Sequence, residues 1–266
     1  MKKALLMMTA CILVIAVDAQ KSVDITYLAN DGFLITSGTE KILIDALFDK
    51  SFGRYDVPSG QLRAEITSGS APFNDIDLYL LTHRDGDHFF APYVIEFLKK
   101  HPETQFISPG QLKESLAGEA GIKKQLTFIS SKVGEMIDTT IGSISLKIYR
   151  VKHLGDSLGN LSANLAFLIK CGDFKILHIG DGPFDFDKKS WEKFHLEKEK
   201  IDILFLEYFG QSDAKRQFIH EVIHPKYIIA QHIPPSDMET EAKKFLEVYP
   251  KATIFKSAME RKTFNE

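Results

Sequence analysis

The stretch Thr82-His83-Arg84-Asp85-Gly86-Asp87-His88 places two histidines and two aspartates within six positions. It directly follows the apolar run Leu-Tyr-Leu-Leu at residues 78–81, which predicts a short buried strand. Neutral imidazoles and ionised carboxylates are the side chains that bind divalent metal ions in proteins. Carboxylates this close repel one another unless a cation lies between them, so a solvated polar turn explains the pattern poorly. We therefore predict a metal-binding loop at the end of this strand.

The first residues have the pattern of a secretory signal peptide. Lys2 and Lys3 precede an almost wholly apolar segment at residues 4–17, and small residues stand at the −3 and −1 positions before Gln20. We therefore predict a signal peptide over residues 1–19 and an exported protein, either periplasmic or secreted. The apolar segment is too short for a comfortable membrane span, so we expect no stable span after the signal is removed.

Two alternatives stay open for this segment: an N-terminal anchor that is retained, and a lipoprotein modified at Cys11. Apolar residues continue past Cys11, which makes the lipoprotein the weaker alternative. Removal of the signal leaves Cys171 alone, and one cysteine cannot form an internal disulfide. The mature domain, residues 20–266, must then be stabilised by its core, and it is long enough to bury a sizeable one.

The composition is that of an ordinary globular protein, with 44% hydrophobic and 26% charged residues. The formal net charge of −3 offers no basic surface for nucleic acid, so we expect a small-molecule substrate and no nucleic-acid partner. The oligomeric state is left undetermined. No repeat, low-complexity segment or linker divides residues 20–266, which predicts one α/β domain in which hairpins recur between helices.

Alternating apolar residues and turn signals predict an antiparallel start, with strands at residues 23–29, 33–36 and 41–44. Residues 50–75 form a long polar connection, either a flap over the site or a surface loop without function. Helices are expected at residues 92–100, 111–116, 191–200, 213–219 and 236–248, the last with Ser236 as N-cap. Further strands are expected at residues 105–107, 126–129, 143–151, 164–170, 174–179, 201–206, 227–230 and 252–255.

Three later apolar runs are also followed by a side chain that can bind a metal ion. These are His153 after residues 148–151, Asp181 after residues 176–179 and His232 after residues 227–230. Loops at strand ends are where a rigid scaffold usually carries its chemistry. We therefore expect these side chains to join the first loop.

Together these motifs resemble the metallo-β-lactamase superfamily. Its members carry His-x-His-x-Asp-His after a strand, then a lone His, a Gly-Asp pair and a final His. The corresponding residues here are His83-x-Asp85-x-Asp87-His88, His153, Gly180-Asp181 and His232. The resemblance implies a four-layer αββα sandwich with two adjacent divalent metal ions, zinc first, with manganese or iron as the other possibilities.

The resemblance also implies a role for each residue. One metal site uses His83, Asp85 and His153, the other uses Asp87, His88 and His232, and Asp181 bridges the two. Asp87 would in addition guide a proton as the catalytic residue. Asp45 directly follows the strand expected at residues 41–44 and corresponds to an Asp of the family that usually supports the ligands. Asp85 departs from the family pattern, since most members have a second His there, and a carboxylate favours harder cations.

The function implied is an exported metal-dependent hydrolase, with a dinuclear centre activating water to cleave a lactone, ester or phosphodiester bond. The likeness is greatest to the ascorbate-phosphate-lactonase-like and phospholipase-D-like branch. Asp85 keeps a second hypothesis open, a non-haem iron oxidoreductase on the same fold. A third, a metal-bound sensing module, is disfavoured because the ligand set is complete.

Overall fold

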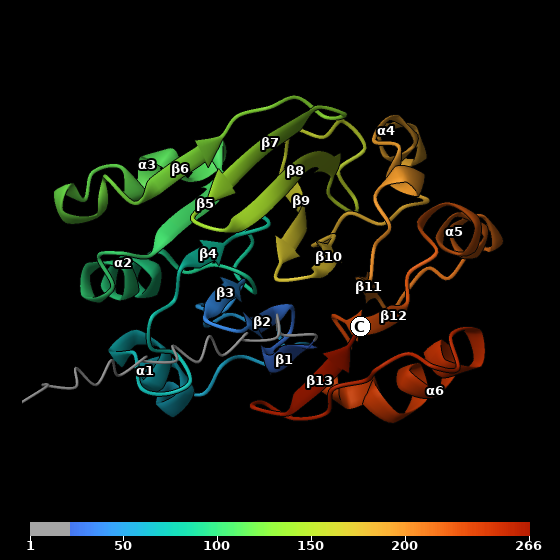
Figure 1. The fold of residues 1–266 in the computed structure, drawn as a ribbon, viewed down its shortest axis with the longest axis horizontal. Helices are drawn as coiled ribbons and strands as arrows, with labels where there is room; N and C mark the ends of the chain where they lie inside the picture. Colours follow the sequence, from blue (N-terminus) through green and yellow to red (C-terminus); the bar gives the residue numbers. More distant parts are fainter. Residues whose placement is uncertain (1–21) are drawn as a thin grey trace, which may run out of the picture.

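Strands in the described part of the chain, residues 22–266 of a computed structural model, form two mixed β-sheets (Figure 1). The predicted signal peptide, with Cys11, lies outside these residues. The order in the first sheet is β13 (Arg261–Asn265), β1 (Ser22–Ala29), β2 (Gly32–Ser37), β3 (Glu40–Ile44), β4 (Leu78–Leu80), β5 (Gln105–Pro109) and β6 (Leu126–Ile129). The order in the second is β12 (Tyr227–Gln231), β11 (Ile203–Glu207), β10 (Phe174–His178), β9 (Ala163–Cys171), β8 (Ile144–Lys152) and β7 (Met136–Ile141).

The predicted antiparallel start is confirmed by the pairing of β1 with β2 and of β2 with β3. From β3 to β6 the first sheet is parallel, as are β10, β11 and β12 in the second. Parallel neighbours end at the same edge of a sheet, so the loops that follow β3 and β4, and those that follow β10 to β12, leave from one edge of each sheet.

Period-two alternation along the strands divides the core into three clusters. Ile44 and Phe167 belong to the cluster between the two sheets, whereas Leu43 faces the helices of the first sheet and Leu168 those of the second. The first sheet is covered by α1 (Gly60–Ser68), α2 (Ala91–Lys100) and α3 (Lys113–Leu116), and the second by α4 (Lys188–Lys193), α5 (Asp213–Phe218) and α6 (Met238–Val248) (Figure 1). This arrangement confirms the predicted four-layer αββα sandwich.

The helix predicted at residues 191–200 is wrong in its extent. The helix α4 ends at Lys193, His195 has a left-handed φ of 52°, and a short 3-10 turn follows at Leu196–Lys198. In one continuous helix Trp191 and Leu196 would point in different directions, because five residues turn the helix by about 500°. The break lets both side chains enter the same core cluster.

Two other predicted elements differ from the structure, and two strands of the structure were not predicted. The helix α6 begins at Met238, with Asp237 as its N-cap and Ser236 in the preceding 3-10 turn. Residues 252–255 supply only an isolated bridge between Thr253 and Ile229, and β13 is the last strand instead. The strand β13 escaped prediction because its side chains are mostly exposed and leave little apolar signal, and β7 escaped it because none of its side chains is fully buried.

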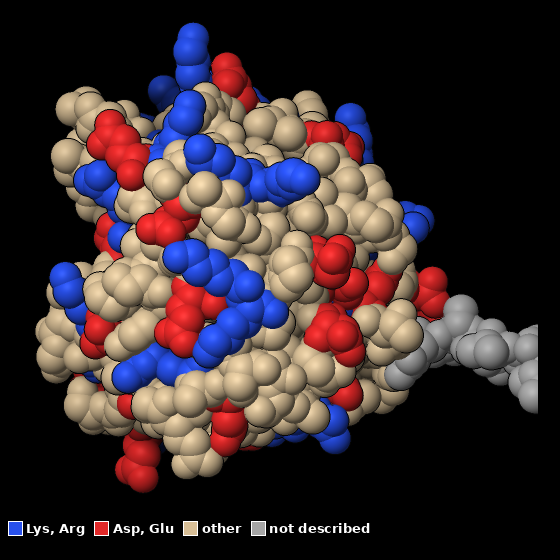
Figure 2. Space-filling view, turned by 90° about the vertical axis from the view of Figure 1, so that its left-hand side faces the viewer, with Lys and Arg blue, Asp and Glu red and all other residues tan. Residues whose placement is uncertain are grey.

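None of the helices within residues 22–266 is long and apolar enough to cross a bilayer. Figure 2 looks onto the side that carries α1, α2 and α3, and there basic and acidic side chains alternate without a continuous basic patch. The expectation that nucleic acid is no partner stays a prediction.

A buried ion pair fixes the loop that follows β11. The Nζ atom of Lys215 lies 2.5 Å from Oε1 of Glu207, and both side chains are almost fully excluded from solvent. The same ammonium donates a hydrogen bond to the carbonyl of Phe209 at 2.8 Å. Helix α5 is thereby tied to the end of β11, and residues 208–212 are held between them.

Replacement of this cation is predicted to destabilise the fold. The K215M variant should lose about 3–5 kcal/mol of unfolding free energy, because Glu207 is left charged and unpaired in the interior. Burial raises the pKa of Glu207 and Lys215 opposes that rise. Without Lys215 the folded state binds the Glu207 proton more tightly than the unfolded state does, so the deficit should shrink as the pH falls.

Urea denaturation of the parent, K215M and E207L/K215M at several pH values measures this effect. The double variant should recover most of the loss. A K215M variant as stable as the parent at neutral pH would contradict the assignment.

Candidate metal centre

The loops that follow β4, β8, β10 and β12 bring all seven predicted residues to one place. Asp181 lies at the centre of the group. Its Oδ2 is 3.6 Å from Nε2 of His153 and 3.3 Å from Nε2 of His232, and its Oδ1 is 3.6 Å from Nε2 of His88. A carboxylate within reach of three imidazoles from three loops has the position of a bridging ligand.

One cluster of ligand atoms is formed by His83, His153 and Asp181, whose nearest atoms all lie within 4.8 Å of one another. Asp85 joins from the side, with Oδ2 at 3.4 Å from Nε2 of His153 and 4.0 Å from Nε2 of His83. Its other oxygen accepts a hydrogen bond from the Ser162 hydroxyl at 3.0 Å. This is the cluster expected for the first metal site.

A second cluster is formed by His88, Asp181, His232 and Asp31, again with ligand atoms within 4.8 Å. Asp87 contacts it, with Oδ2 at 3.8 Å from Nε2 of His88 and 3.7 Å from Nε2 of His232. Asp31 was not among the predicted ligands. It lies in the β1–β2 turn, where the sequence Asn-Asp-Gly gave only a hairpin signal.

The hydrogen bonds of the imidazoles test whether these residues fit a metal ion. The Nδ1 atom of His88 donates to Asp45 at 2.8 Å, that of His83 donates to the Thr82 hydroxyl at 2.9 Å, and that of His153 donates to a backbone carbonyl at 2.7 Å. In its neutral form, each ring then carries its proton on Nδ1 and presents the lone pair of Nε2.

None of these three Nε2 atoms has a hydrogen-bond partner among the described residues, and the same holds for Nε2 of His232 and Oδ1 of Asp181. Buried polar atoms without partners are rare in folded proteins. Several that converge on one space fit divalent cations well.

Electrostatics support the same conclusion. Burial and the neighbouring His88 lower the pKa of His83 well below its usual range. Burial opposes protonation of His88 as well, but the carboxylates of Asp181 and Asp45 outweigh it and raise the pKa of His88. The charges of His232 and His88 outweigh burial at Asp181 and hold its pKa well below the usual value. The cluster thus requires positive charge, which metal ions supply in such sites.

The comparisons with known proteins agree with this geometry. The family model described as the beta-lactamase superfamily domain matches residues 24–232. The chain belongs to this superfamily. No match was found among curated proteins.

Solved structures share the fold at low identity. The metallo-β-lactamase fold protein YhfI from Bacillus subtilis is 15% identical, with a TM-score of 0.63 over 92% of this chain and 100% of that one. A possible metal-dependent hydrolase from Veillonella parvula is 13% identical, with a TM-score of 0.65 over 91% and 99%. The diiron β-hydroxylase CmlA from Streptomyces venezuelae is 12% identical, with a TM-score of 0.59 over 93% of this chain and 54% of that one. At these identities the likeness shows the fold alone.

In this superfamily member buried polar side chains hold the loops of the centre. Asp45, which the sequence predicted as a supporting residue, accepts hydrogen bonds from the backbone and hydroxyl of Thr82 as well as from His88. Asn164 accepts from the backbone N–H of Asp181 at 3.0 Å and donates to the carbonyl of Ile179 at 2.9 Å. These contacts fix the directions of the proposed ligands before any cation binds.

A glycine makes the turn before Asp181 possible. Gly180 has a left-handed φ of 54°, and a Cβ at this position would stand 2.6 Å from Oδ1 of Asn164 and 2.8 Å from Cβ of Thr82. Only glycine accommodates both this backbone conformation and the close approach of the loop after β4.

The polar connection at residues 50–75 reaches the centre through its first part, in agreement with the flap alternative. The ring of Tyr55 packs edge-on against His232, with centroids 4.1 Å apart. The guanidinium of Arg54 donates to the Tyr208 hydroxyl at 2.6 Å. Lys50 lies against Gly86, where a Cβ would stand 2.7 Å from its Cδ. Tyr55 gave no sequence signal, because it lies in an irregular polar connection and belongs to none of the ligand motifs.

Four other residues near the predicted ligands differ in their roles. Tyr208 and Phe209 lie at the mouth of the centre, and Phe209 is 6.3 Å from His232 between ring centroids. His178 is buried between the sheets and packs on Phe33 and Phe205, which is a structural role. Phe89 belongs to the core under α1 and α2.

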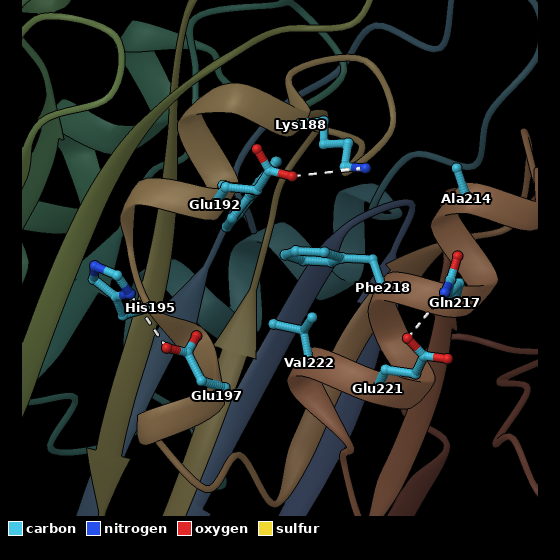
Figure 3. A pocket seen from close by; sticks show the side chains of 10 residues that line it. Lys188, Glu192, His195, Glu197, Ala214, Gln217, Phe218, Glu221 and Val222 are labelled. Carbon is cyan, nitrogen blue, oxygen red and sulfur yellow. Dashed lines mark hydrogen bonds and ion pairs between the residues drawn. The ribbon is translucent and has the colours of Figure 1, made fainter.

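A groove between α4 and α5 is a separate feature of the surface (Figure 3). It encloses about 350 Å³ over Phe218 and Val222, and none of the seven predicted residues lines it. Its polar side chains pair with one another, as Lys188 does with Glu192 and Gln217 with Glu221 (Figure 3). We therefore place the chemistry at the histidine and aspartate cluster.

Metal content tests the two-site arrangement. The purified parent should hold two divalent cations per chain, and the variants H153A and H232A should each hold about one, because each removes a ligand from a different cluster. The variant D181N should lose both, since Asp181 joins the clusters. Elemental analysis by mass spectrometry after dialysis measures these contents.

The variant H220A, which removes an exposed histidine, serves as the control and should keep two cations. Circular dichroism checks that each variant is folded. Equal metal content in H153A, H232A and the parent would contradict the arrangement.

Proposed function

We propose that this superfamily member is an exported metal-dependent hydrolase that cleaves a lactone, ester or phosphodiester bond in a small molecule. The observation that carries the proposal is the convergence of four unpartnered Nε2 atoms on the central Asp181. Such a donor set suits two divalent cations, which supply an activated water and Lewis-acid stabilisation when bound. The residues His83, Asp85, His153, Asp87, His88, His232 and Asp181 would hold them.

Asp87 is the residue best placed to move a proton. Its Oδ2 accepts a hydrogen bond from the amide of Asn30 at 3.3 Å and lies beside His88 and His232. The side chain is almost fully buried, so its carboxylate faces the cluster rather than bulk water. We assign Asp87 to accept the proton of the attacking water and to return it to the leaving group.

Exposed apolar side chains beside His153, and a hollow next to the flap, support a small substrate with an apolar part. Arg54, Tyr208 and Phe209 line a hollow of about 400 Å³ whose far wall is formed by α6. Leu154, on the loop after His153, is exposed, and Leu158 and Leu161 follow it on the same loop. The cationic side chains of this hollow are Arg54 and Lys244, a weaker provision for phosphate than an arginine cluster.

The alternative is a non-haem iron oxidoreductase. It is favoured by the carboxylate of Asp85 at a position that is His in most members of the superfamily, and by the fold shared with a diiron β-hydroxylase. Protein purified without added metal would then contain iron, and its activity would require oxygen. Zinc or manganese content with oxygen-independent turnover would favour the hydrolase.

Turnover of a substrate panel tests the proposal. Chromogenic lactones, esters and phosphodiesters are each assayed with zinc, manganese and iron in turn. On any substrate that the parent cleaves, H83A and D181N should lose at least about a hundredfold in kcat/KM, because each removes a direct contact to the cations. The control H220A should keep parental activity. Unchanged turnover in both site variants, with folding verified, would refute the assignment.

Export is tested by fractionation of cells that produce the full chain. We expect the mature protein outside the cytoplasm, with a mass that corresponds to cleavage before Gln20, because residues 1–19 have the signal-peptide pattern. A full-length chain retained with the membrane would favour the anchor instead, and a lipid-modified chain beginning at Cys11 would favour the lipoprotein.

A further inference from the structure

The geometry points to Asp31 as an additional metal ligand, in the cluster of His88, Asp181 and His232. This inference rests on the proposed binding of cations at the centre. Asp31 adds to that cluster a carboxylate that belongs to none of the motifs shared with the superfamily. The second site would then hold its cation with more oxygen donors than the motifs alone provide.

The burial of Asp31 is the first argument. Aspartate in an Asn-Asp-Gly hairpin turn is normally solvated. Here the residue is fully buried, its Oδ2 accepts a hydrogen bond from the amide of Gln231 at 3.0 Å, and its Oδ1 has no partner. An unpartnered carboxylate oxygen in the interior is unfavourable unless a cation lies beside it.

The surroundings of Asp31 are the second argument. One ligand atom from each of Asp31, His88, Asp181 and His232 lies within 4.8 Å of the other three. Nε2 of His88 and Nε2 of His232 are also without hydrogen-bond partners. Three loops and one hairpin thus direct unpaired ligand atoms into the same space.

The backbone of the hairpin holds Asp31 in this position. Asn30 has a left-handed φ of 47°, and its amide donates to the backbone carbonyl and to Oδ2 of Asp87. A Cβ on Gly32 would stand 2.8 Å from the carbonyl of Asp45. The turn is therefore packed directly against the loops that carry Asp45 and Asp87, and Asp31 is buried there.

Asp31 also changes the total charge of the ligand set. With Asp31 the centre holds four carboxylates, the others being Asp85, Asp87 and Asp181, which together match the charge of two divalent cations. Carboxylate oxygens favour manganese and ferrous iron relative to an imidazole-rich set, which suits zinc. We therefore expect Asp31 to contribute more to the binding of manganese than to that of zinc.

The variant D31N tests this assignment. Metal-stripped parent and D31N are titrated with Mn²⁺ and, separately, with Zn²⁺ in competition with a chromophoric chelator. We expect one of the two Mn²⁺ affinities to fall by about 10–100-fold in D31N, the range seen when a contact of a metal site is removed. The Zn²⁺ affinities should fall less.

The matched control is D173N, the same substitution in the exposed turn between β9 and β10. It should leave both affinities at the parental values. Parental Mn²⁺ affinity in D31N would overturn the assignment of Asp31, and an equal loss for both metals would overturn its preference for manganese.

The outcome separates this inference from the proposed function. A parent that binds two cations and turns over substrate, with D31N unaltered, would overturn the role of Asp31 alone. A parent that binds neither metal would overturn both. If D31N fails to fold, a crystal structure of the manganese-loaded parent tests the assignment of Asp31 instead. An Asp31 oxygen at about 2.2 Å from a cation supports the assignment. An oxygen beyond about 3 Å overturns it.

Discussion

The concentration of carboxylates and imidazoles in one buried space is the constraint on which this structure depends. Asp181 lies within 3.6 Å of nitrogen atoms from His88, His153 and His232, and almost all of these groups are excluded from water. Burying ionised groups is costly unless opposite charge and hydrogen bonds compensate. The loops after β4, β8, β10 and β12 leave several of these atoms without hydrogen-bond partners, in positions where divalent cations could compensate them.

The scaffold supplies hydrogen bonds to the ligand atoms that face away from the centre. Several of the ligand atoms that face into it have no hydrogen-bond partner among the described residues. Asp45 and Thr82 fix the Nδ1 sides of His88 and His83, while Asn164 fixes the backbone at Asp181. The carbonyl of Thr82 also accepts a hydrogen bond from the N–H of Leu165, which joins a loop of the first sheet to a strand of the second. Metal geometry is thus coupled to the packing of the two sheets.

The two ends of the centre differ in their access to solvent. Asp85 is about a third exposed and His153 is partly exposed, whereas His88, His232 and Asp31 are buried. Tyr55 and Arg54 of the flap lie over the buried end, where Tyr55 packs on His232 and Arg54 binds Tyr208. The end of the centre that carries Asp85 and His153 is therefore the more accessible to solvent.

The sequence by itself determined the proposed ligand types, and its motifs carry the family resemblance that implied the four layers. Each predicted ligand follows an apolar strand, so strand ends alone predicted where His153 and His232 would lie. Such signals are local, since they depend on spacing within a few residues.

Only the tertiary structure decided the rest. Asp31 becomes a candidate ligand because it is buried, where it accepts a hydrogen bond from Gln231, 200 positions away. Tyr55 packs on His232, which is also far from it in the sequence. The strand β13 is defined by its pairing with β1 rather than by its own residues. Burial of a turn residue depends on what packs over it, and that information is absent from the spacing of residues along the chain.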